Sequence, residues 1–260
     1  MRRNIKLTIA YDGSEFRGWQ IQPGLPTVQG TLSEIIGRTT GEKVLPQGSG
    51  RTDTGVHAMA QIATFETESP IPLENFRVVL NDRLPTSIRV LGVEEAPEDF
   101  HARHSALAKT YRYRVYRDEI VPPWLARYVA HHPWPLDEAA VFEAAKYVLG
   151  EHDFTSFAAC DPDKTTRAEE DEEGEVPKHA TNVRTIYESS WHRCDGEIIY
   201  TVRGNGFLHH MVRNFVGTFL LVGKGTWKPE DVKRIIAAKD RSAAGPTAPA
   251  SGLWMVGVEY

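Results

Sequence analysis

The chain has 260 residues, 41% of them hydrophobic and 25% charged, a composition that supports a globular core and excludes general disorder. Two cysteines are too few for a disulfide framework or for the four ligands of a structural zinc site, so reduced thiols and a cytoplasmic location are expected. No stretch reaches the roughly 18 uninterrupted apolar residues of a membrane span, so no membrane partner is expected.

The net charge of −5 is unevenly distributed along the chain. Residues 161–175 hold eight acidic side chains against Lys164 and Arg167, a local charge of −6, so the remainder of the chain carries +1. Residues 101–117 hold five cations and no acid, interleaved with tyrosines. Clustered cations with aromatic rings are typical of surfaces that contact phosphates and stacked bases, although a solvated strand face has the same composition.

Apolar residues that alternate with polar ones predict strands, and apolar residues at helical spacing predict helices. In the first part of the chain we expect a strand at 5–11, a helix from 28 that stops before Gly41, a strand at 61–67, a helix at 72–83 and a strand at 88–94.

In the second part, the strand at 109–115 sorts its tyrosines and arginines to opposite faces. A helix is expected from Asp137, its N-cap, to residue 149, with Gly150 as its stop. Further on we expect paired strands at 183–193 and 197–203 with Asp195 and Gly196 in the turn, helices along 208–220 and from Pro229, and a last strand at 254–258.

Strands and helices that do not alternate regularly favour the α+β class with antiparallel pairing. We divide the chain into an N-terminal half, 1–104, and a C-terminal half, 105–260. The acidic stretch at 161–178 has no periodicity, so we interpret it as a mobile insertion that projects away from the functional surface and carries no chemistry.

The segment GSGRTDTGVHA at 48–58 is the first candidate site. Its glycines allow the backbone to bend sharply and to present Asp53. An ordinary Asx-type turn has the same residue types. The segment is not a Walker phosphate loop, and one carboxylate does not make a glycosidase pair. The segment alone therefore leaves the role of Asp53 open.

Two further residues stand out on predicted elements. Tyr111 lies on the strand face opposite Arg112, a position that suits both a core tyrosine and a tyrosine lining a cleft. Arg213 lies on the strongest helical stripe but off its apolar side. The adjacent His209 and His210 do not suggest a metal site, because neighbouring helical positions point about 100° apart and no Cys or acid completes a ligand set.

Eight segments, in order along nearly the whole chain, resemble the TruA family of tRNA pseudouridine synthases. Two of them contain blocks long enough to be specific: GRTDTGVHA at 50–58, and HHMVRN within GNGFLHHMVRNFVG at 204–217. The others are YDGSEFRGWQ at 11–20, TVQG at 27–30, LP at 84–85, FHARHSA at 100–106, KTYRYRV at 109–115 and AGPTAPASGLW at 244–254. His104 and Gly206 depart from the family's usual Phe and Ala, and the acidic insertion is the larger departure.

The resemblance implies an isomerase that converts uridine to pseudouridine at positions 38, 39 and 40 of the tRNA anticodon stem-loop, with no cofactor and no metal. It implies Asp53 as the catalytic nucleophile and Tyr111 as the ring that stacks on the target uracil. It implies that Arg213 pairs with the aspartate, that Arg51 contacts RNA and displaces the base, and that Leu253 packs behind the site. The first step stays open between attack on the base, attack on the sugar and removal of a sugar proton.

The resemblance also implies the pseudouridine synthase fold, a mixed and mainly antiparallel central sheet built from two similar halves with the active-site cleft between them. It further implies a homodimer with tRNA lying across both subunits. Two alternatives remain: a non-catalytic RNA-binding protein of the same fold, and an RNA base glycosylase that uses the same carboxylate and lets the base leave.

Overall fold

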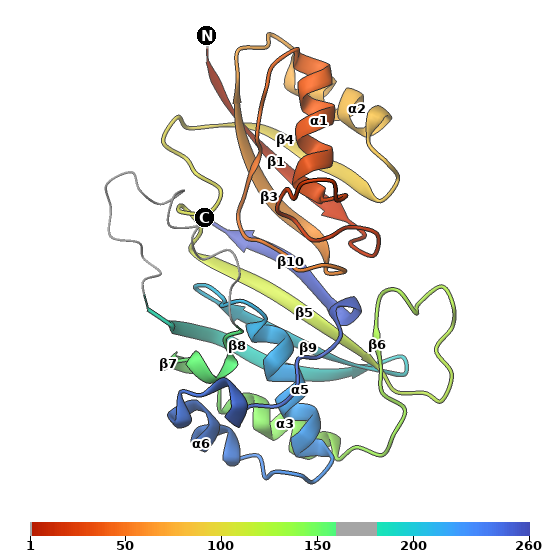
Figure 1. Cartoon of the computed structure of the whole chain (residues 1–260), viewed down its shortest axis with the longest axis vertical. Coiled ribbons are helices and arrows are strands. Elements are labelled where there is room, and N and C mark those ends of the chain that lie inside the picture. The colour runs from red at the N-terminus through yellow and green to blue at the C-terminus, as the bar shows by residue number, and fades with distance from the viewer. Residues whose placement is uncertain (1, 160–180) are drawn as a thin grey trace. The chain divides into compact units, whose positions relative to one another are not determined.

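The computed structural model describes residues 2–159 and 181–260 (Figure 1). The acidic insertion expected at 161–178 lies outside the described residues. The chain forms two compact units. Unit 1 comprises Met1–Tyr116, Ile120–His131 and Ala250–Tyr260, and unit 2 comprises Arg117–Glu119 and His132–Pro249.

Unit 1 is built on a sheet whose strand order is β4-β1-β3-β10-β5. These strands are β1 (Arg3–Tyr11), β3 (His57–Thr67), β4 (Ile88–Ala96), β5 (Ala108–Tyr116) and β10 (Leu253–Glu259). Neighbours pair antiparallel, except that β10 runs parallel to β3. The short strands β2 (Gln47–Gly48) and β6 (Ala130–His131) pair with β3 and β5 respectively. The predicted α+β class with a mixed, mainly antiparallel sheet is confirmed.

Alternation along the strands places the core of unit 1. In β5, Tyr111, Tyr113 and Val115 are buried, whereas Arg112 is exposed, which confirms the predicted sorting of tyrosines and arginines. The helices α1 (Val28–Thr40) and α2 (Leu73–Arg83) lie side by side and bury apolar side chains such as Leu32 (Figure 1). Helix α1 ends where Gly41, with φ of 79°, donates its N–H to the Gly37 carbonyl, so its predicted stop is confirmed.

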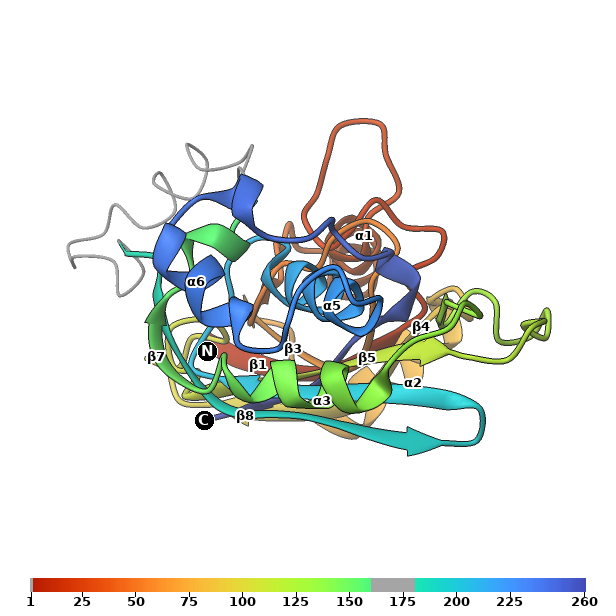
Figure 2. The ribbon, with the colours of Figure 1, turned by 90° about the horizontal axis from the view of Figure 1, so that it is seen from below.

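Unit 2 contains the antiparallel strands β7 (Gly150–Asp153), β8 (Val183–Cys194) and β9 (Glu197–Gly204). The turn between β8 and β9 has positive φ at Asp195 and Gly196, as a type I′ hairpin requires, and confirms the prediction. The helices α3 (Glu138–Lys146), α5 (Met211–Gly223) and α6 (Asp231–Ala238) lie on one side of this hairpin (Figure 2). One-turn helices lie at Thr155–Phe157, Arg241–Ala243 and, in unit 1, Ala250–Gly252.

The predicted end of α3 is wrong, although its N-cap is right. The Asp137 side chain accepts the Ala140 N–H at 3.0 Å. The helix ends at Lys146, because Tyr147 already donates to the Ala144 carbonyl in a tight last turn. Gly150, with φ of 93°, begins β7 instead of stopping the helix. Val148 is fully buried outside the helix, which is why the apolar pattern continued beyond its end.

The expectation that His209 and His210 diverge as helical neighbours is also wrong. Both precede α5, which begins at Met211, and His210 has a positive φ of 59°. Their ring centroids lie 3.9 Å apart. Helical geometry therefore does not separate these two histidine rings.

The two compact units differ from the halves 1–104 and 105–260. Strand β10 lies between β3 and β5 and pairs with both, so β5 and β10 belong to the same unit as β3.

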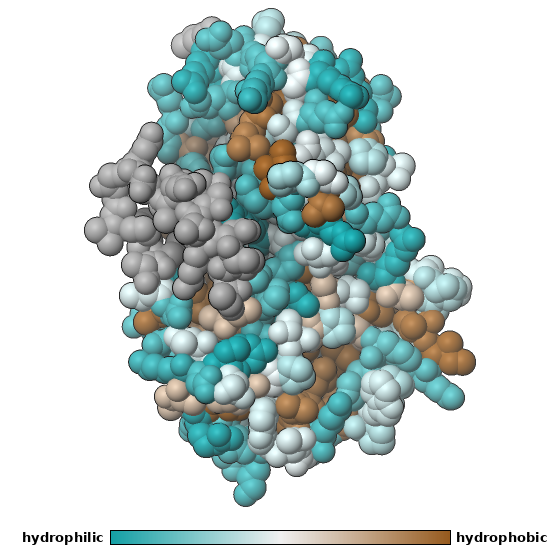
Figure 3. Space-filling view, viewed as in Figure 1, coloured by the Kyte–Doolittle hydropathy of each residue, from teal (hydrophilic) through white to brown (hydrophobic). Residues whose placement is uncertain are grey.

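Among residues 2–159 and 181–260, no helix has both the length and the apolar character needed to cross a membrane. The loop between β5 and β6, at the right of the view in Figure 3, carries Ile120 and Trp124, which are 78% and 73% exposed.

Helix α5 packs closely against residues 245–249 through main-chain atoms. A Cβ at Gly217 would overlap the carbonyl oxygen of Pro246. One turn earlier, Arg213 donates its Nε–H to the Ala248 carbonyl at 2.8 Å and accepts the Ala248 N–H at its own carbonyl at 3.2 Å. These two hydrogen bonds fix the position of the Arg213 main chain and of its Nε atom.

We expect Gly217→Ala to destabilise the protein by about 3 kcal/mol, because the new methyl must push the Pro246 main chain away from α5. Gly257→Ala in β10 is the matched control, since no atom lies within 4 Å of its Cβ position, and it should stay within about 0.5 kcal/mol of wild type. Thermal unfolding measures both. Equal midpoints for the two variants would contradict the close packing.

Candidate active site

The loop at residues 49–56, here called the Asp53 loop, is anchored at its start by side chains of unit 1. Ser49 donates its N–H to the Ile62 carbonyl at 2.7 Å and its hydroxyl to Gln61 at 2.6 Å. The Gln61 amide donates in turn to the Gly50 carbonyl at 2.7 Å. The Lys109 ammonium donates to the Ser49 carbonyl. The loop therefore leaves β2 in a fixed direction.

The centre of the Asp53 loop is held as firmly as its start. The Thr52 carbonyl accepts the Trp19 N–H at 3.0 Å, and the Thr52 hydroxyl lies 2.8 Å from that of Tyr11. The Asp53 carbonyl accepts the Val56 N–H at 3.1 Å, and Gly55 has the positive φ of 79° that the third residue of a type II turn requires. The Asp53 side chain, partly buried, thus projects from an ordered turn.

A second loop, residues 12–19, packs against the Asp53 loop main chain to main chain. A Cβ at Gly13 would overlap the Val56 carbonyl. Gly18 has φ of 87°, and a Cβ there would lie 2.6 Å from the Thr52 carbonyl oxygen. Both positions require glycine, because the two backbones approach too closely for a side chain. The 12–19 loop therefore supports the residues on both sides of Asp53.

His57, the first residue of β3, is completely buried beside these loops. Its Nδ1 accepts the Gly13 N–H at 3.1 Å, and its Nε2 lies 3.0 Å from the Arg127 carbonyl. Because a carbonyl can only accept, these contacts indicate the neutral tautomer with its proton on Nε2. Burial lowers the pKa of His57 and outweighs the opposing charge of Asp12. The ring stacks on Trp254 with centroids 4.4 Å apart.

Asp12 is held next to this histidine. One of its carboxylate oxygens accepts the Ser14 N–H at 2.9 Å and the Ser14 hydroxyl at 2.6 Å, and the other accepts the Tyr128 hydroxyl at 3.0 Å. Burial acts to raise the pKa of Asp12, but these hydrogen bonds and the nearby His57 lower it on balance. The carboxylate is therefore ionised and fixed, 3.2 Å from His57 Nδ1.

Tyr111 lies in β5 on the side of the sheet that faces the Asp53 loop. A Cβ at Gly50 would be 3.9 Å from the Tyr111 hydroxyl and 3.4 Å from Lys109 Nζ. Burial, and then the charges of Tyr11 and Asp53, raise the pKa of Tyr111, so the phenol keeps its proton at neutral pH. Lys109 was not selected as a site residue from the sequence, although its spacing of two from Tyr111 placed both on one strand face.

The remaining predicted site residues are distributed over both units. Arg51 is partly buried in the Asp53 loop. Leu253 is buried at the start of β10, where it pairs with Tyr113, and Met255 two residues later pairs with Tyr111. Unit 1 thus brings Asp53, Arg51, Tyr111 and Leu253 into one sheet and its loop, whereas Arg213 belongs to unit 2.

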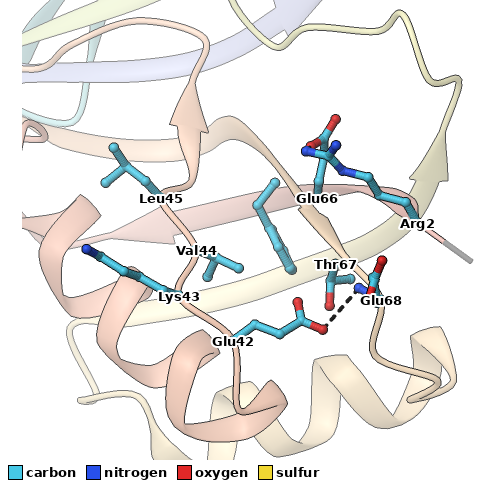
Figure 4. A pocket seen from close by; sticks show the side chains of 9 residues that line it. Arg2, Glu42, Lys43, Val44, Leu45, Glu66, Thr67 and Glu68 are labelled. Atoms are coloured by element: carbon cyan, nitrogen blue, oxygen red, sulfur yellow. Dashed lines mark hydrogen bonds and ion pairs between the residues drawn. The ribbon is translucent and has the colours of Figure 1, made fainter.

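A pocket of about 450 Å³ lies at the opposite end of β3 from the Asp53 loop (Figure 4). Its rim is mixed in charge: Arg2 pairs with Glu66, and Glu42 accepts the Glu68 N–H at 3.0 Å. No predicted site residue lines it.

Comparison with known proteins gives one family over nearly the full length. Residues 7–105 and 144–260 match the family model described as tRNA pseudouridine synthase. A tRNA pseudouridine synthase A of Solibacter usitatus is 49% identical over 258 residues, which cover 99% of this chain and 100% of that protein. Proteins of the same name from Brevibacillus brevis and Caldicellulosiruptor bescii are each 43% identical, over 99% of this chain and 100% of theirs. Tyr111 falls between the two matched ranges.

The buried, neutral His57 predicts a pH dependence of stability. Its pKa is lowered from 6.5 in the folded protein, so the unfolded chain binds the proton first as pH falls. The contribution of neutral His57 to the stability of the folded protein is fully present above about pH 6.5, and it is lost as the pH falls through the lowered pKa of His57. We expect the thermal midpoint of wild type to fall more between about pH 7.5 and 5.5 than that of His57→Asn, which cannot titrate.

The matched control is His192→Asn, because the His192 side chain is exposed. This variant should keep the wild-type dependence of the midpoint on pH. A dependence as steep in His57→Asn as in wild type would show that His57 does not titrate differently in the folded and unfolded states.

Proposed function

The chain belongs to the tRNA pseudouridine synthase family, and we propose that it acts at positions 38, 39 and 40 of the tRNA anticodon stem-loop with Asp53 as its nucleophile. It is an isomerase that converts uridine in tRNA to pseudouridine. The full-length identity of 49% to the Solibacter usitatus protein carries this conclusion, because it spans the Asp53 loop, β5, α5 and β10 together.

The reaction needs no redox change and no group donor. The bond between uracil N1 and the ribose C1′ breaks, and a bond from uracil C5 to the same carbon forms. The proton on C5 is lost to solvent and N1 gains one, so the mass of the RNA is unchanged. We propose that side chains alone carry this isomerisation, without a cofactor or metal.

The surroundings of Asp53 support its role. A nucleophilic carboxylate must be ionised and held in one orientation. The hydrogen bonds of Thr52 and the turn to Val56 hold the main chain on both sides of Asp53 in place. We propose that Arg213 supplies the positive charge that pairs with Asp53, as the family resemblance implies. Its guanidinium is oriented by the 2.8 Å hydrogen bond to Ala248.

We propose that three other residues, Tyr111, Arg51 and Leu253, bind and position the target base. Tyr111 presents a protonated phenol from β5 and is proposed to stack on the uracil. Arg51 is proposed to contact RNA and to help displace the target base, a step that costs a few kcal/mol of unstacking. Leu253 is proposed to pack behind the site from its buried position in β10. We also propose a cytoplasmic homodimer with tRNA across both subunits.

Asp53→Asn should lower the rate of pseudouridine formation by about 10⁴-fold or more, as removal of a nucleophile does in other enzymes. The measurement is tritium release from tRNA labelled at uracil C5, with retained tRNA binding as the control for folding. Equal release by wild type and variant would remove Asp53 from the reaction. No release by wild type would favour the non-catalytic RNA-binding protein.

Mass spectrometry of the product separates the synthase from the glycosylase alternative. An isomerase leaves the mass of the tRNA unchanged, whereas base loss lowers it and leaves an abasic site. The unchanged mass is the expected result.

Position-resolved mapping of pseudouridine tests the substrate assignment. Incubation of unmodified tRNA with the protein should produce pseudouridine at positions 38, 39 and 40 and nowhere else. Modification confined to another region of tRNA would overturn the anticodon assignment and leave the reaction intact.

A further inference from the structure

His57 is the side chain through which the 12–19 loop is tied to the start of β3. We propose that His57 is a positioning residue for pseudouridine formation, because it holds the 12–19 loop against the turn that carries Asp53. The inference rests on the proposed function, in which Asp53 is the reacting group. We do not assign His57 a catalytic role, since its side chain is completely buried.

The connection from His57 to Asp53 has three contacts. Gly13 donates its N–H to His57 Nδ1 at 3.1 Å. Gly13 then lies directly against the Val56 carbonyl, at a distance that leaves no room for a Cβ. Val56 donates its own N–H to the Asp53 carbonyl at 3.1 Å. A shift of Gly13 is therefore passed to the turn through atoms already in contact.

The same loop touches the Asp53 loop at its other end. Trp19 donates its N–H to the Thr52 carbonyl at 3.0 Å, and Gly18 lies against that carbonyl and Asp53. Residues 13 and 18–19 thus contact the Asp53 loop on both sides of the aspartate. A loss of the His57 anchor removes support from one side only, which predicts a misplaced carboxylate in a folded protein.

The histidine ring is itself fixed, as an anchor must be. It stacks on Trp254 at an interplanar angle of 22° and meets the edge of Tyr128 with centroids 5.3 Å apart. Its Nε2 donates to the Arg127 carbonyl at 3.0 Å. Burial keeps the ring neutral, so Nδ1 retains the lone pair that Gly13 needs, although the Asp12 carboxylate lies 3.2 Å away.

Two substitutions separate the two hydrogen bonds of this ring. The Asn side chain places an acceptor oxygen near the position of Nδ1, and the Gln side chain places a donor nitrogen near that of Nε2. His57→Asn therefore keeps the bond from Gly13 and loses the bond to Arg127. His57→Gln does the reverse. A general loss of packing affects both variants, whereas the positioning role affects only His57→Gln.

The experiment measures kcat and KM for tRNA by tritium release, together with thermal midpoints and hydrogen exchange of the peptide covering residues 50–58. In His57→Gln we expect kcat to fall by about 10- to 100-fold, the loss that a displacement of about 1 Å produces, with KM within about twofold of wild type. Exchange in the peptide should be faster. His57→Asn should recover kcat to within about threefold of wild type.

Wild-type kcat in His57→Gln would overturn the inference, as would an Asn variant impaired as much as the Gln variant. Asp53→Asn in the same assay distinguishes this failure from failure of the proposed function. If Asp53→Asn is inactive and His57→Gln has wild-type kcat, only the positioning role is wrong. If Asp53→Asn keeps its activity, the assignment of Asp53 itself is wrong.

Discussion

The candidate site in unit 1 depends on close contact between two stretches of main chain, the 12–19 loop and the Asp53 loop. Gly13 and Gly18 bring the 12–19 loop so near to Thr52 and Val56 that neither position can hold a side chain. Hydrogen bonding alone leaves a loop some freedom to slide, but direct contact of two backbones does not. Asp53 lies between these contacts, so its main chain is held in place by other main-chain atoms and not by side chains that can change rotamer.

The sheet joins Asp53 to the other residues that are proposed to contact the target base. Strand β10 pairs with β3, which follows the Asp53 loop, and with β5, which carries Tyr111. Lys109, on the same face of β5, donates to the Ser49 carbonyl at the start of the loop. The ring proposed to stack on the uracil and the carboxylate proposed to react with the target nucleotide are therefore supported by one continuous set of strands.

Local patterns predicted the parts of the fold that depend on near neighbours. The burial of Tyr111 opposite the exposed Arg112 follows from the alternation of side chains along any strand. The Asp137 N-cap and the turn at Asp195 and Gly196 are likewise determined by a few adjacent residues. The resemblance to a family selected Asp53, which the loop residues alone did not separate from an ordinary turn.

The errors and omissions arise where distant residues decide the outcome. Val148 is buried by tertiary packing after α3 has ended, so its spacing extended the predicted helix too far. His210 takes a positive φ that its residue type does not predict. His57 has partners at Gly13, Arg127 and Trp254, which only the folded chain brings together. The role of His57 therefore could not be predicted from the residues next to it in the sequence.

The position of β10 also constrains the order in which the chain can fold. Strands β3 and β5 become neighbours only through β10, and all of unit 2 separates β5 from β10 along the chain. A growing chain that has released residues 57–116 but not β10 leaves the edges of β3 and β5 that β10 later joins without a partner, and such edges readily pair with other chains. The pairing that closes this gap is of long sequence separation and is therefore slow. Unit 1 therefore completes its sheet only after unit 2 has been synthesised and β10 has been released.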